Sequence, residues 1–374
     1  MINDRPTKLI VNLDAVLNNY KKFVKLAGDK KVIAVVKANS YSLGADKISE
    51  LLYDNGARYF AVATLEEAIE LRKKIKDGLI LVLGVTNPLN VNYAIENNVS
   101  LCCPSEDWLT QAISVVKNNS KLKVHVKLET GMNRIGIFDK EELRHVDNLL
   151  KSEKIIFEGV FSHFAQADGE NNIYDNQQID KFNDLLSTFT KKPTYIHLDN
   201  SAGTIKYHNC HADYQLVRVG ISLYGEYPSS NIEKLYGIKL DTIASLVSKV
   251  THVKRIKKGS KVGYGSTYEA KEDEYIATIP IGYADGLFRR AQGYKIIVGD
   301  ELCEIVGRVC MDQLMVRCSE NIKVGDDVLF FGEYNNKKLS IDDFADYQNT
   351  ISYEILCAIH TRVPRVYLSN DKEI

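Results

Sequence analysis

Lys37 directly follows Val32–Val36, a fully apolar run that predicts a buried strand. A lysine at the end of such a strand is held on a rigid support beside apolar surroundings, and burial lowers the pKa of an amine. An amine that has lost its proton can form a Schiff base with an aldehyde cofactor. Lys37 is therefore a candidate for covalent catalysis, and a solvated lysine at a strand end is the competing interpretation.

Two short loops further along the chain have the character of phosphate-binding sites. Asn200–Gly203 and Gly220–Ser222 each combine a hydroxyl side chain with glycine and the backbone amides at the start of an expected helix. Such amides and the helix dipole favour anions. Each segment alone is more often a plain helix cap. Two of them after neighbouring strands favour a phosphate site.

The elements that must position these groups alternate between about residue 30 and residue 220, where short β-branched runs separate longer amphipathic stretches. Thr64 and Glu67 form a capping-box pattern at the start of one such stretch. Parallel strands need crossover connections, so eight runs with crossovers predict an α/β fold, a parallel (β/α)8 TIM barrel over residues 1–235. Active-site groups of such barrels lie at the C-terminal ends of the strands. The expected strands are Val32–Val36, Tyr59–Val62, Ile80–Leu83, Leu101–Cys103, Lys123–Leu128, Phe157–Phe161, Thr194–Leu198 and Gln215–Val217.

The pattern changes after about residue 235, where short alternating runs are separated by Gly and Asp turns such as Gly299-Asp300 and Gly325-Asp326. Residues 236–374 are therefore expected to form a mainly-β domain, on which part of the N-terminal segment can pack, with a short helix at Asp342–Tyr347. The expected strands are Ala244–Val253, Tyr275–Ile279, Lys295–Val298, Cys303–Val306, Leu314–Arg317 and Val328–Phe331.

The composition excludes several classes of protein. The 374 residues carry 48 basic and 49 acidic side chains, so no basic field is available to attract nucleic acid or an acidic membrane. Residues 1–8 have no apolar core, so no secretory signal is expected, and the seven cysteines form no C-x-x-C pair. These features predict a cytoplasmic protein. The eight histidines are dispersed, so no metal site is expected, and 21 tyrosines stand against one tryptophan.

Nine segments resemble, in order, the signature segments of alanine racemases, which are pyridoxal-phosphate enzymes with a barrel and a C-terminal β domain. The resemblance extends from Lys31 to Arg365 and is strongest in VGYGSTY, VGRVCMDQ and the last segment, because the lysine segment is shared with other barrel-type pyridoxal-phosphate proteins. The segments are AVVKANSYSLGA, KLETGMNRIG, FSHFA, DNSAG, VRVGISLYG, VGYGSTY, PIGYADG, VGRVCMDQ and SYEILCAIHTRVPR.

The resemblance implies a two-base racemase that interconverts L- and D-alanine for the bacterial cell wall. Lys37 would hold pyridoxal 5'-phosphate and act as the base on one face of the substrate. Tyr264 would be the base on the opposite face, contributed by the partner subunit of a head-to-tail homodimer. Two groups are expected because one base cannot easily reach both faces of a fixed substrate, and both have ordinary pKa values near 10, which the site must lower. His163, with Arg218 behind it, is a candidate network for lowering the tyrosine pKa.

The remaining roles also follow from the resemblance. Arg218 would contact the pyridine nitrogen, where a guanidinium disfavours protonation and so weakens the ring as an electron sink. The phosphate would be held by Tyr41, Ser201, Tyr353 and the backbone at Gly220 and Ile221.

The substrate side of the site follows in the same way. Arg134 would orient the phenolic base and the cofactor oxygen. Met311 and Tyr283, from the partner subunit, would line the entrance and meet the substrate carboxylate, with Asp312 supporting Met311. Lys127 matches a lysine that is often carbamylated in the family, and a plain ion pair with a neighbouring acid is the competing interpretation.

The sequence departs from the commonest family pattern at Ser40, Ser42, Leu43, Asn133 and Gly263. Whether these departures broaden the substrate range toward serine or larger amino acids stays open. A decarboxylase of basic amino acids shares the two-domain plan but lacks VGYGSTY and usually places a carboxylate at the pyridine nitrogen. A non-catalytic pyridoxal-phosphate carrier would be a single barrel. A metal-dependent hydrolase would need a histidine cluster that the sequence lacks.

Overall fold

The computed structural model describes residues 5–370 and 372–374. Contacts group residues 17–40 and 45–241 into one compact unit, and residues 5–16, 41–44 and 242–374 apart from residue 371 into another. We call these the barrel unit and the β unit. The expected boundary at residues 235 and 236 stays a prediction of where the domains separate.

The barrel unit is built on one parallel sheet of eight strands in the order β8-β7-β6-β5-β4-β3-β2-β9. Two backbone hydrogen bonds connect the two ends of this sheet. The amide of Gln215 donates to the carbonyl of Ile196, and the amide of Arg218 donates to the carbonyl of Asp199. The expected near-closed (β/α)8 barrel is therefore confirmed. The strands are β2 (Lys31–Val35), β3 (Tyr59–Val62), β4 (Leu79–Val82), β5 (Ser100–Cys103), β6 (Leu122–Lys127), β7 (Ile155–Phe161), β8 (Tyr195–His197) and β9 (Leu216–Val219).

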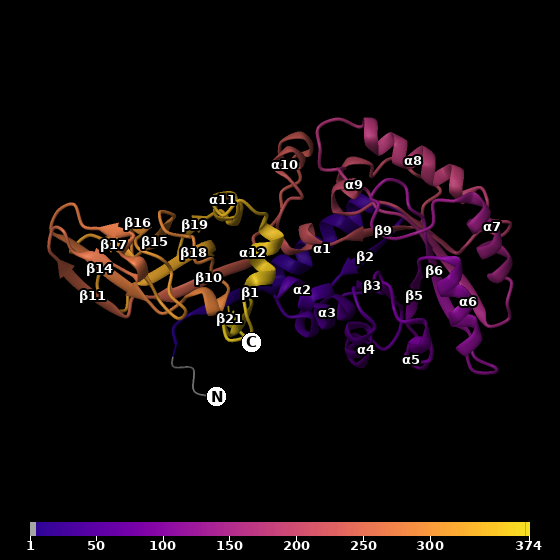
Figure 1. Cartoon of the computed structure of the whole chain (residues 1–374), viewed down its shortest axis with the longest axis horizontal. Helices are drawn as coiled ribbons and strands as arrows, with labels where there is room; N and C mark the ends of the chain where they lie inside the picture. The colour runs from indigo at the N-terminus through magenta and orange to yellow at the C-terminus, as the bar shows by residue number, and fades with distance from the viewer. Residues whose placement is uncertain (1–4, 371) are drawn as a thin grey trace. The chain divides into compact units, whose positions relative to one another are not determined.

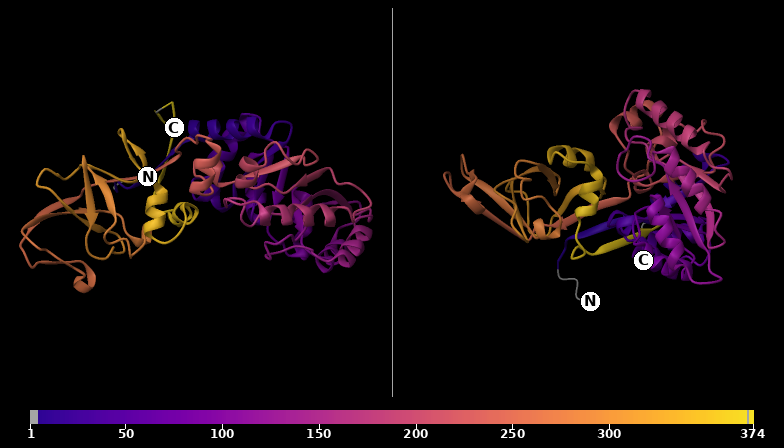
Figure 2. Two further views of the ribbon diagram at one scale, coloured as in Figure 1. Left: turned by 90° about the horizontal axis from the view of Figure 1, so that it is seen from above. Right: turned by 45° about the vertical axis from the view of Figure 1, so that its right-hand side comes forward.

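Helices lie outside these strands (Figures 1 and 2). Helix α4 begins after Thr64, whose hydroxyl accepts the Glu67 amide in the expected capping box. The connecting elements are α1 (Leu13–Ala27), α3 (Ala45–Asp54), α4 (Leu65–Lys74), η1 (Pro88–Asn90), α5 (Val91–Glu96), α6 (Glu106–Val115), α7 (Lys140–Leu149), α8 (Ile173–Leu186), α9 (Ser201–Lys206), η2 (Ile221–Tyr224) and α10 (Ser230–Tyr236).

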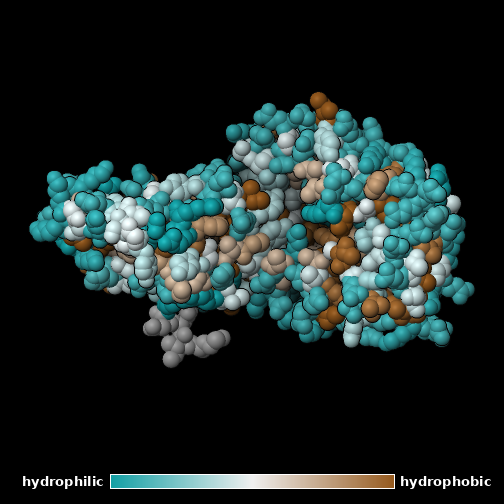
Figure 3. Space-filling model, in the orientation of Figure 1, coloured by the Kyte–Doolittle hydropathy of each residue, from teal (hydrophilic) through white to brown (hydrophobic). Residues whose placement is uncertain are grey.

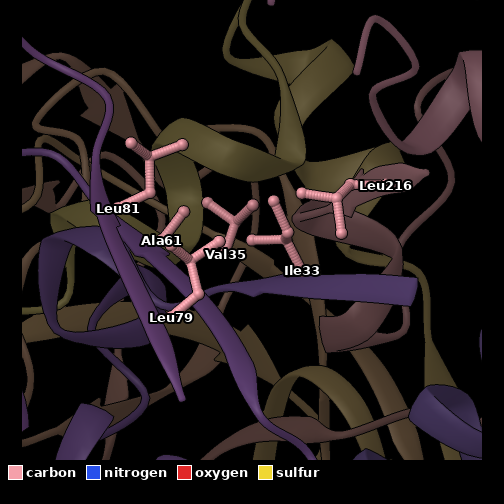
Figure 4. Close-up of a cluster of buried hydrophobic side chains, with 6 residues drawn as sticks. All are labelled: Ile33, Val35, Ala61, Leu79, Leu81 and Leu216. Atoms are coloured by element: carbon pink, nitrogen blue, oxygen red, sulfur yellow. The ribbon is translucent and has the colours of Figure 1, made fainter. Parts of the chain in front are cut away.

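Apolar side chains from neighbouring strands meet in one layer of the barrel core (Figure 4). Ile33 and Val35 of β2 pack with Leu79 and Leu81 of β4 and with Leu216 of β9. Alternate residues of a strand point the same way, so β2 contributes two members of this layer. The visible surface of the barrel unit is mostly hydrophilic (Figure 3). No helix among the described residues is long and apolar enough to cross a membrane.

The β unit contains a sheet of eleven described strands in the order β11-β14-β17-β16-β15-β18-β10-β1-β20-β21, with β19 paired to β18. A mainly-β C-terminal domain is thus confirmed, and β1 (Lys8–Asn12) joins its sheet between β10 and β20. The other strands are β10 (Ala244–Lys249), β11 (His252–Ile256), β14 (Glu274–Ile279), β15 (Lys295–Val298), β16 (Glu301–Ile305), β17 (Leu314–Cys318), β18 (Asp327–Tyr334), β19 (Lys337–Leu339), β20 (Arg365–Ser369) and β21 (Lys372–Glu373).

One expected strand of this unit is wrong in its extent. Ala244–Val253 is two strands, because Val250 donates its amide to Asp326 beside β18 whereas Thr251 donates to Thr278 of β14. The chain therefore changes pairing partner between these two residues. A second small sheet pairs β12 (Lys261–Val262) with β13 (Tyr268–Glu269), and the helices are η3 (Tyr264–Ser266), η4 (Tyr283–Asp285), α11 (Ile341–Tyr347) and α12 (Ser352–Ala358).

Candidate active site

Lys37 stands two residues after β2, at the C-terminal end of a barrel strand, and begins the short helix α2 (Lys37–Tyr41). Residues 38–42 all have positive φ, from 52° at Ala38 to 66° at Ser42. Five successive left-handed residues without glycine are costly, since each L-residue loses roughly 1–2 kcal/mol there. Strain of this kind persists only where surrounding structure fixes it, and it clusters at functional sites.

Glu67 fixes part of this turn, a role that the sequence showed only as helix capping. One carboxylate oxygen of Glu67 accepts the amide of Ala38 at 2.7 Å, and the other accepts the amide of Ala63 at 2.7 Å. The carboxylate thus ties the residue after Lys37 to the loop before α4. The acid three residues into α4 was visible as a capping-box signal, but its second contact depends on the tertiary fold.

The two expected phosphate-binding loops meet in the barrel unit. The Ser201 hydroxyl accepts the amide of Gly220 at 2.9 Å, and Asn200 caps α9 by accepting the amide of Gly203 at 2.9 Å. Ser201 still has its hydroxyl proton to donate, because its contact with Gly220 uses only the oxygen. The Gly220 amide is already engaged, so the Ser201 hydroxyl and the amide at Ile221 are the better donors for a phosphate.

Arg218 of β9 is buried in the barrel, with a side chain 3% exposed. Its guanidinium donates to the carbonyls of Ser162 at 2.7 Å and Leu198 at 2.8 Å. It also contacts Nδ1 of His197 at 2.8 Å and Nδ1 of His163 at 3.1 Å. Burial lowers the pKa of Arg218 to about 10, so the group stays charged at neutral pH. The expected pairing of His163 with Arg218 is thus present.

The same interior holds two further groups whose titration is shifted. Burial, reinforced by the charge of Arg218, holds the pKa of His163 well below its usual range, so this imidazole is neutral. Lys127 of β6 is 2% exposed and donates to the Leu128 carbonyl at 2.6 Å. Burial lowers the pKa of Lys127 to about 8. No carboxylate among the described residues lies within ion-pair distance of the Lys127 amine, which disfavours the plain ion pair.

Arg134 lies in the loop after β6, and Glu129 organises that loop. The Glu129 carboxylate accepts the backbone amides of Gly131 and, at 3.3 Å, of Arg134. Although burial opposes ionisation, these backbone hydrogen bonds hold the pKa of Glu129 below its ordinary value. Asn133, one of the departures from the family pattern, has φ of 53° and donates its side-chain amide to the carbonyl of Gly131. Arg134 itself is exposed.

The β unit presents three of the expected site residues to solvent. Tyr264 in η3 is 68% exposed, Met311 is 52% exposed and Tyr283 in η4 is 38% exposed. The amide of Tyr283 donates to the carbonyl of Cys310, and that of Ala284 donates to the carbonyl of Met311, both at 3.0 Å. The loops carrying Tyr283 and Met311 are therefore fastened together.

A buried carboxylate holds these two loops in place. Asp285 is fully buried, accepts the amide of Gly282 at 2.8 Å and receives both terminal nitrogens of Arg5 at 2.8 and 2.9 Å. Arg362 contacts Asp285 at 3.1 Å and Asp312 at 2.8 Å. Asp312 thus supports the loop of Met311 through Arg362. This network joins segments about 280 residues apart, which no local pattern could predict.

Tyr41 and Tyr353, the two expected phosphate-binding tyrosines, lie together in the β unit. Their rings meet edge to face with centroids 6.1 Å apart. Burial raises the pKa of Tyr41 above its usual range, so the hydroxyl keeps its proton and can donate to a phosphate.

The expected site residues thus fall into one set per unit. Within each unit, contacts join some of these residues, such as Tyr41 with Tyr353, the loop of Tyr283 with that of Met311, and Arg218 with His163. The barrel unit holds Lys37, Lys127, Arg134, His163, Ser201, Arg218, Gly220 and Ile221, and the β unit holds Tyr41, Tyr264, Tyr283, Met311, Asp312 and Tyr353. The sequence did not reveal Glu129, His197 or Asp285 as supporting residues.

Two family models match the chain. Residues 11–228 match the N-terminal domain of alanine racemase, and residues 243–367 match its C-terminal domain. The chain belongs to the alanine racemase family. An alanine racemase from Staphylococcus epidermidis is 43% identical over 374 residues, which cover 99% of this chain and 96% of the relative. One from Pediococcus pentosaceus is 40% identical, with 98% and 97% covered.

Solved structures of racemases share the whole fold. Alanine racemase from Bacillus anthracis with bound L-Ala-P has a TM-score of 0.95 at 36% identity, with 100% of this chain and 98% of that chain covered. Histidine racemase from Leuconostoc mesenteroides has a TM-score of 0.90 at 30% identity, with 98% and 99% covered. The family is therefore one of amino-acid racemases, which are isomerases, and the fold also serves a substrate much larger than alanine.

Proposed function

We propose that this chain interconverts L- and D-alanine with pyridoxal 5'-phosphate, using Lys37 and the Tyr264 of a second copy as the two bases. The observation that carries the proposal is the buried Arg218, held by His163, His197 and two carbonyls inside the barrel that also carries Lys37. The alanine racemases that match at 40–43% identity over nearly their whole length support alanine as the substrate.

The residues of the barrel unit fit this cofactor. Lys37 offers an amine for the aldehyde at the end of β2, and the Ser201 hydroxyl beside Gly220 offers a donor for the phosphate. Arg218 offers a fixed cation for the pyridine nitrogen. The bound cofactor would delocalise the negative charge that develops when the substrate Cα loses its proton. The protein then has to supply positioned bases and charge.

Proton transfer on two faces assigns different tasks to the two bases. Lys37 takes or returns the Cα proton on one face, and the Tyr264 hydroxyl does so on the other. Because Tyr264 is 68% exposed on the β unit, it is available to a second copy of the chain. We infer a homodimer whose active sites combine the barrel unit of one subunit with Tyr264, Tyr283 and Met311 of the other. Arg218 donates to Nδ1 of the neutral His163, so the proton of this imidazole is on Nε2, which would donate it in a hydrogen bond to the oxygen of the phenolic base and so favour the phenolate.

We infer that Arg134 orients the phenolic base and that Lys127 supports Arg134 once the lysine carries a carboxylate. We infer that Lys127 is carbamylated. An amine with a pKa of about 8 is partly neutral near physiological pH, and only the neutral amine adds to carbon dioxide. A 13C-bicarbonate label should give a carbamate signal in the native protein that Lys127→Met abolishes; an unlabelled native protein would contradict this inference.

We also propose that the enzyme acts in the cytoplasm and supplies D-alanine for peptidoglycan. This role follows from the cell-wall function of the racemases that the sequence resembles. The near-neutral charge of the chain supports a small-molecule substrate rather than nucleic acid or a membrane as its partner.

Spectroscopy and optical activity test the function directly. The purified protein should be yellow, should lose that absorbance band in Lys37→Ala, and should erase the circular dichroism of L-alanine. Serine and histidine should be tested beside alanine, because a neighbour of this fold is a histidine racemase. Faster racemisation of serine or histidine would replace alanine as the substrate, and a protein unable to bind pyridoxal phosphate would overturn the proposal.

A further inference from the structure

A row of hydrogen-bonded side chains runs through the interior of the barrel unit from Arg218 to Glu158. Arg218 contacts Nδ1 of His197 at 2.8 Å, and Nε2 of His197 contacts Nδ1 of His125 at 2.9 Å. Nε2 of His125 then contacts the Glu158 carboxylate at 3.1 Å. The members come from β9, β8, β6 and β7. Arg218 contributes to the proposed site, whereas Glu158 and His125 have no part in it so far.

The chemistry of the two ends gives this row one direction. A guanidinium has donors only, so Nδ1 of His197 must accept from Arg218, and the proton of His197 is on Nε2. That proton is donated to Nδ1 of His125, which places the proton of His125 on Nε2. An ionised carboxylate has acceptors only, so Glu158 accepts that last proton. Each histidine is therefore neutral and held in one tautomer.

The surroundings preserve this arrangement. His125 and His197 are fully buried, and burial holds the pKa of His197 well below its usual range. Although burial opposes ionisation of Glu158, its hydrogen bond from His125 keeps the pKa of the carboxyl below its ordinary value. The His197 ring stacks on Phe161 with centroids 5.0 Å apart, and the His125 ring stacks on Tyr195 at 6.2 Å.

Gly159 on β7 provides the space that the His125 ring occupies. A Cβ at this position would lie 2.2 Å from Nδ1 of His125, so any other residue would displace the ring. The His125 ring can therefore occupy its position in the row only because the neighbouring residue on β7 is glycine.

Glu158 lies at the opposite end of the barrel from Lys37. It lines a cavity of about 240 Å3 together with Tyr59, Leu79, Ser100 and Tyr195, each the first residue of its strand. The Ser100 hydroxyl donates to the carboxylate, and the amine of Lys123 is 3.9 Å away. The row thus connects Arg218 with the N-terminal ends of the strands, where the carboxylate is partly exposed.

We propose that Glu158 is a positioning residue for Arg218, which it orients through His125 and His197 from the far end of the barrel. With the carboxylate in place, His197 presents a lone pair to the guanidinium. Without the carboxylate, the proton of His125 can move from Nε2 to Nδ1, where it points at the Nε2 proton of His197. His197 can relieve this repulsion only by moving its own proton to Nδ1, where the proton points at Arg218. Arg218 then loses one acceptor and the direction in which it is held. This proposal rests on the proposed role of Arg218 at the pyridine nitrogen.

The experiment compares Glu158→Leu, which removes the acceptor, with Glu158→Gln, which keeps an acceptor but not the charge. Asp147→Asn is the matched control, because Asp147 is a buried carboxylate of the same unit that accepts from the amide and hydroxyl of Thr190, lies 3.7 Å from the amine of Lys151 and has no hydrogen bond to a member of this row. The first readout is the 15N spectrum of the histidines in full-length protein without cofactor. Wild type should carry the proton of both His125 and His197 on Nε2. Glu158→Leu should change the tautomer of His125, and Glu158→Gln should restore it in part.

The second readout is made on the protein loaded with pyridoxal phosphate. Glu158→Leu should shift the visible absorbance band and raise transamination relative to racemisation by about tenfold, comparable to the lower end of the effect of removing the hydrogen-bond partner of a metal ligand. Asp147→Asn should leave both unchanged. Gly159→Ala, which displaces His125 while leaving Glu158 intact, should reproduce the Glu158→Leu result.

Each outcome has one meaning. A wild-type protein with the proton of either histidine on Nδ1 overturns the proposal, and so do loaded Glu158→Leu and Gly159→Ala variants that match Asp147→Asn in spectrum and reaction ratio. If Glu158→Leu does not fold, the wild-type tautomers and Gly159→Ala still decide. A wild-type chain that shows the expected tautomers but binds no pyridoxal phosphate would refute the proposed function while leaving the direction of the row intact.

Discussion

Lys127 and Arg218 both have basic side chains buried inside the barrel unit, but they differ in how many hydrogen-bond partners stabilise the positive charge. The Arg218 guanidinium has two short carbonyl contacts and two imidazole contacts, whereas the Lys127 amine has one short carbonyl contact and a hydroxyl at 3.5 Å. A buried charge without compensating partners loses its proton. Arg218 is thus a permanent cation and Lys127 an amine that can become neutral.

The lowered pKa of Lys127 predicts how stability depends on pH. The folded protein disfavours the lysine cation, so between pH of about 8 and the ordinary value of 10.5 the unfolded chain binds more protons. Stability contributed by this site should therefore rise with pH over that window. In buffer free of carbon dioxide, the free energy of unfolding of wild type relative to Lys127→Met should increase by about 2 kcal/mol from pH 7 to pH 9.5. A difference independent of pH would show that the amine titrates normally.

The charge of Arg218 predicts which side reaction the enzyme avoids. A cation at the pyridine nitrogen disfavours protonation there, which limits the lifetime of a carbanion and hence transamination. Arg218→Glu should raise the ratio of transamination to racemisation by about tenfold or more, equivalent to about 1.4 kcal/mol in relative barrier height. Arg218→Lys keeps the charge and should leave the ratio closer to wild type. An unchanged ratio in a folded, cofactor-loaded Arg218→Glu protein would sink this explanation.

The left-handed turn after Lys37 contains a buried serine that is expected to destabilise the folded protein. Ser40 within this turn is fully buried with φ of 53°, and its hydroxyl has no hydrogen-bond partner among the described residues. A buried hydroxyl without a partner costs roughly 1–3 kcal/mol. The family pattern more often has alanine here, so this chain carries a cost that the commoner residue avoids.

Ser40→Ala should therefore raise the free energy of unfolding of the cofactor-free protein by about 1 kcal/mol. Ser40→Val should lower it by more than about 1 kcal/mol, because a β-branched residue is poorly accommodated at positive φ. Ser49→Ala is the matched control, since Ser49 is a buried serine without a partner in the regular helix α3. Urea unfolding measures all three. A loss of stability in Ser40→Ala with a gain in Ser49→Ala would show that the Ser40 hydroxyl is engaged after all.

Elements with a strong local period could be predicted from the sequence, and those fixed by distant contacts could not. All eight barrel strands were expected within about two residues of their observed ends, because each is a short run rich in apolar residues. Helix α1 and the β20 strand were not expected. The left-handed turn at residues 38–42 contains no glycine from which it could have been predicted, and it depends on the Glu67 contact with Ala38. The supporting groups around the site, such as Asp285 with Arg5, join residues too far apart for any spacing rule.

At the scale of the whole molecule, the two proposed bases belong to different units of the chain. Lys37 is in the barrel unit and Tyr264 is in the β unit, where it is 68% exposed together with Met311 at 52%. Tyrosine and methionine are among the side chains enriched in protein–protein interfaces. A symmetric dimer in which each β unit completes the partner's site accounts for both features.

Subunit mixing tests this arrangement. Lys37→Ala and Tyr264→Phe should each be inactive alone. After complete exchange of equal amounts, half of the dimers are hybrids, and each hybrid has one site with both bases and one with neither, so about a quarter of wild-type activity should return. If each chain instead uses its own Lys37 and Tyr264, no hybrid site is intact and no activity returns.

Mixing Lys37→Ala with Arg218→Ala is the matched control. Both residues lie in the barrel unit, so neither arrangement of the dimer can restore a site. Recovery in the first mixture, with none in the control, would assign the second base to the partner subunit, and demonstrated exchange without recovery would place a complete site within each chain.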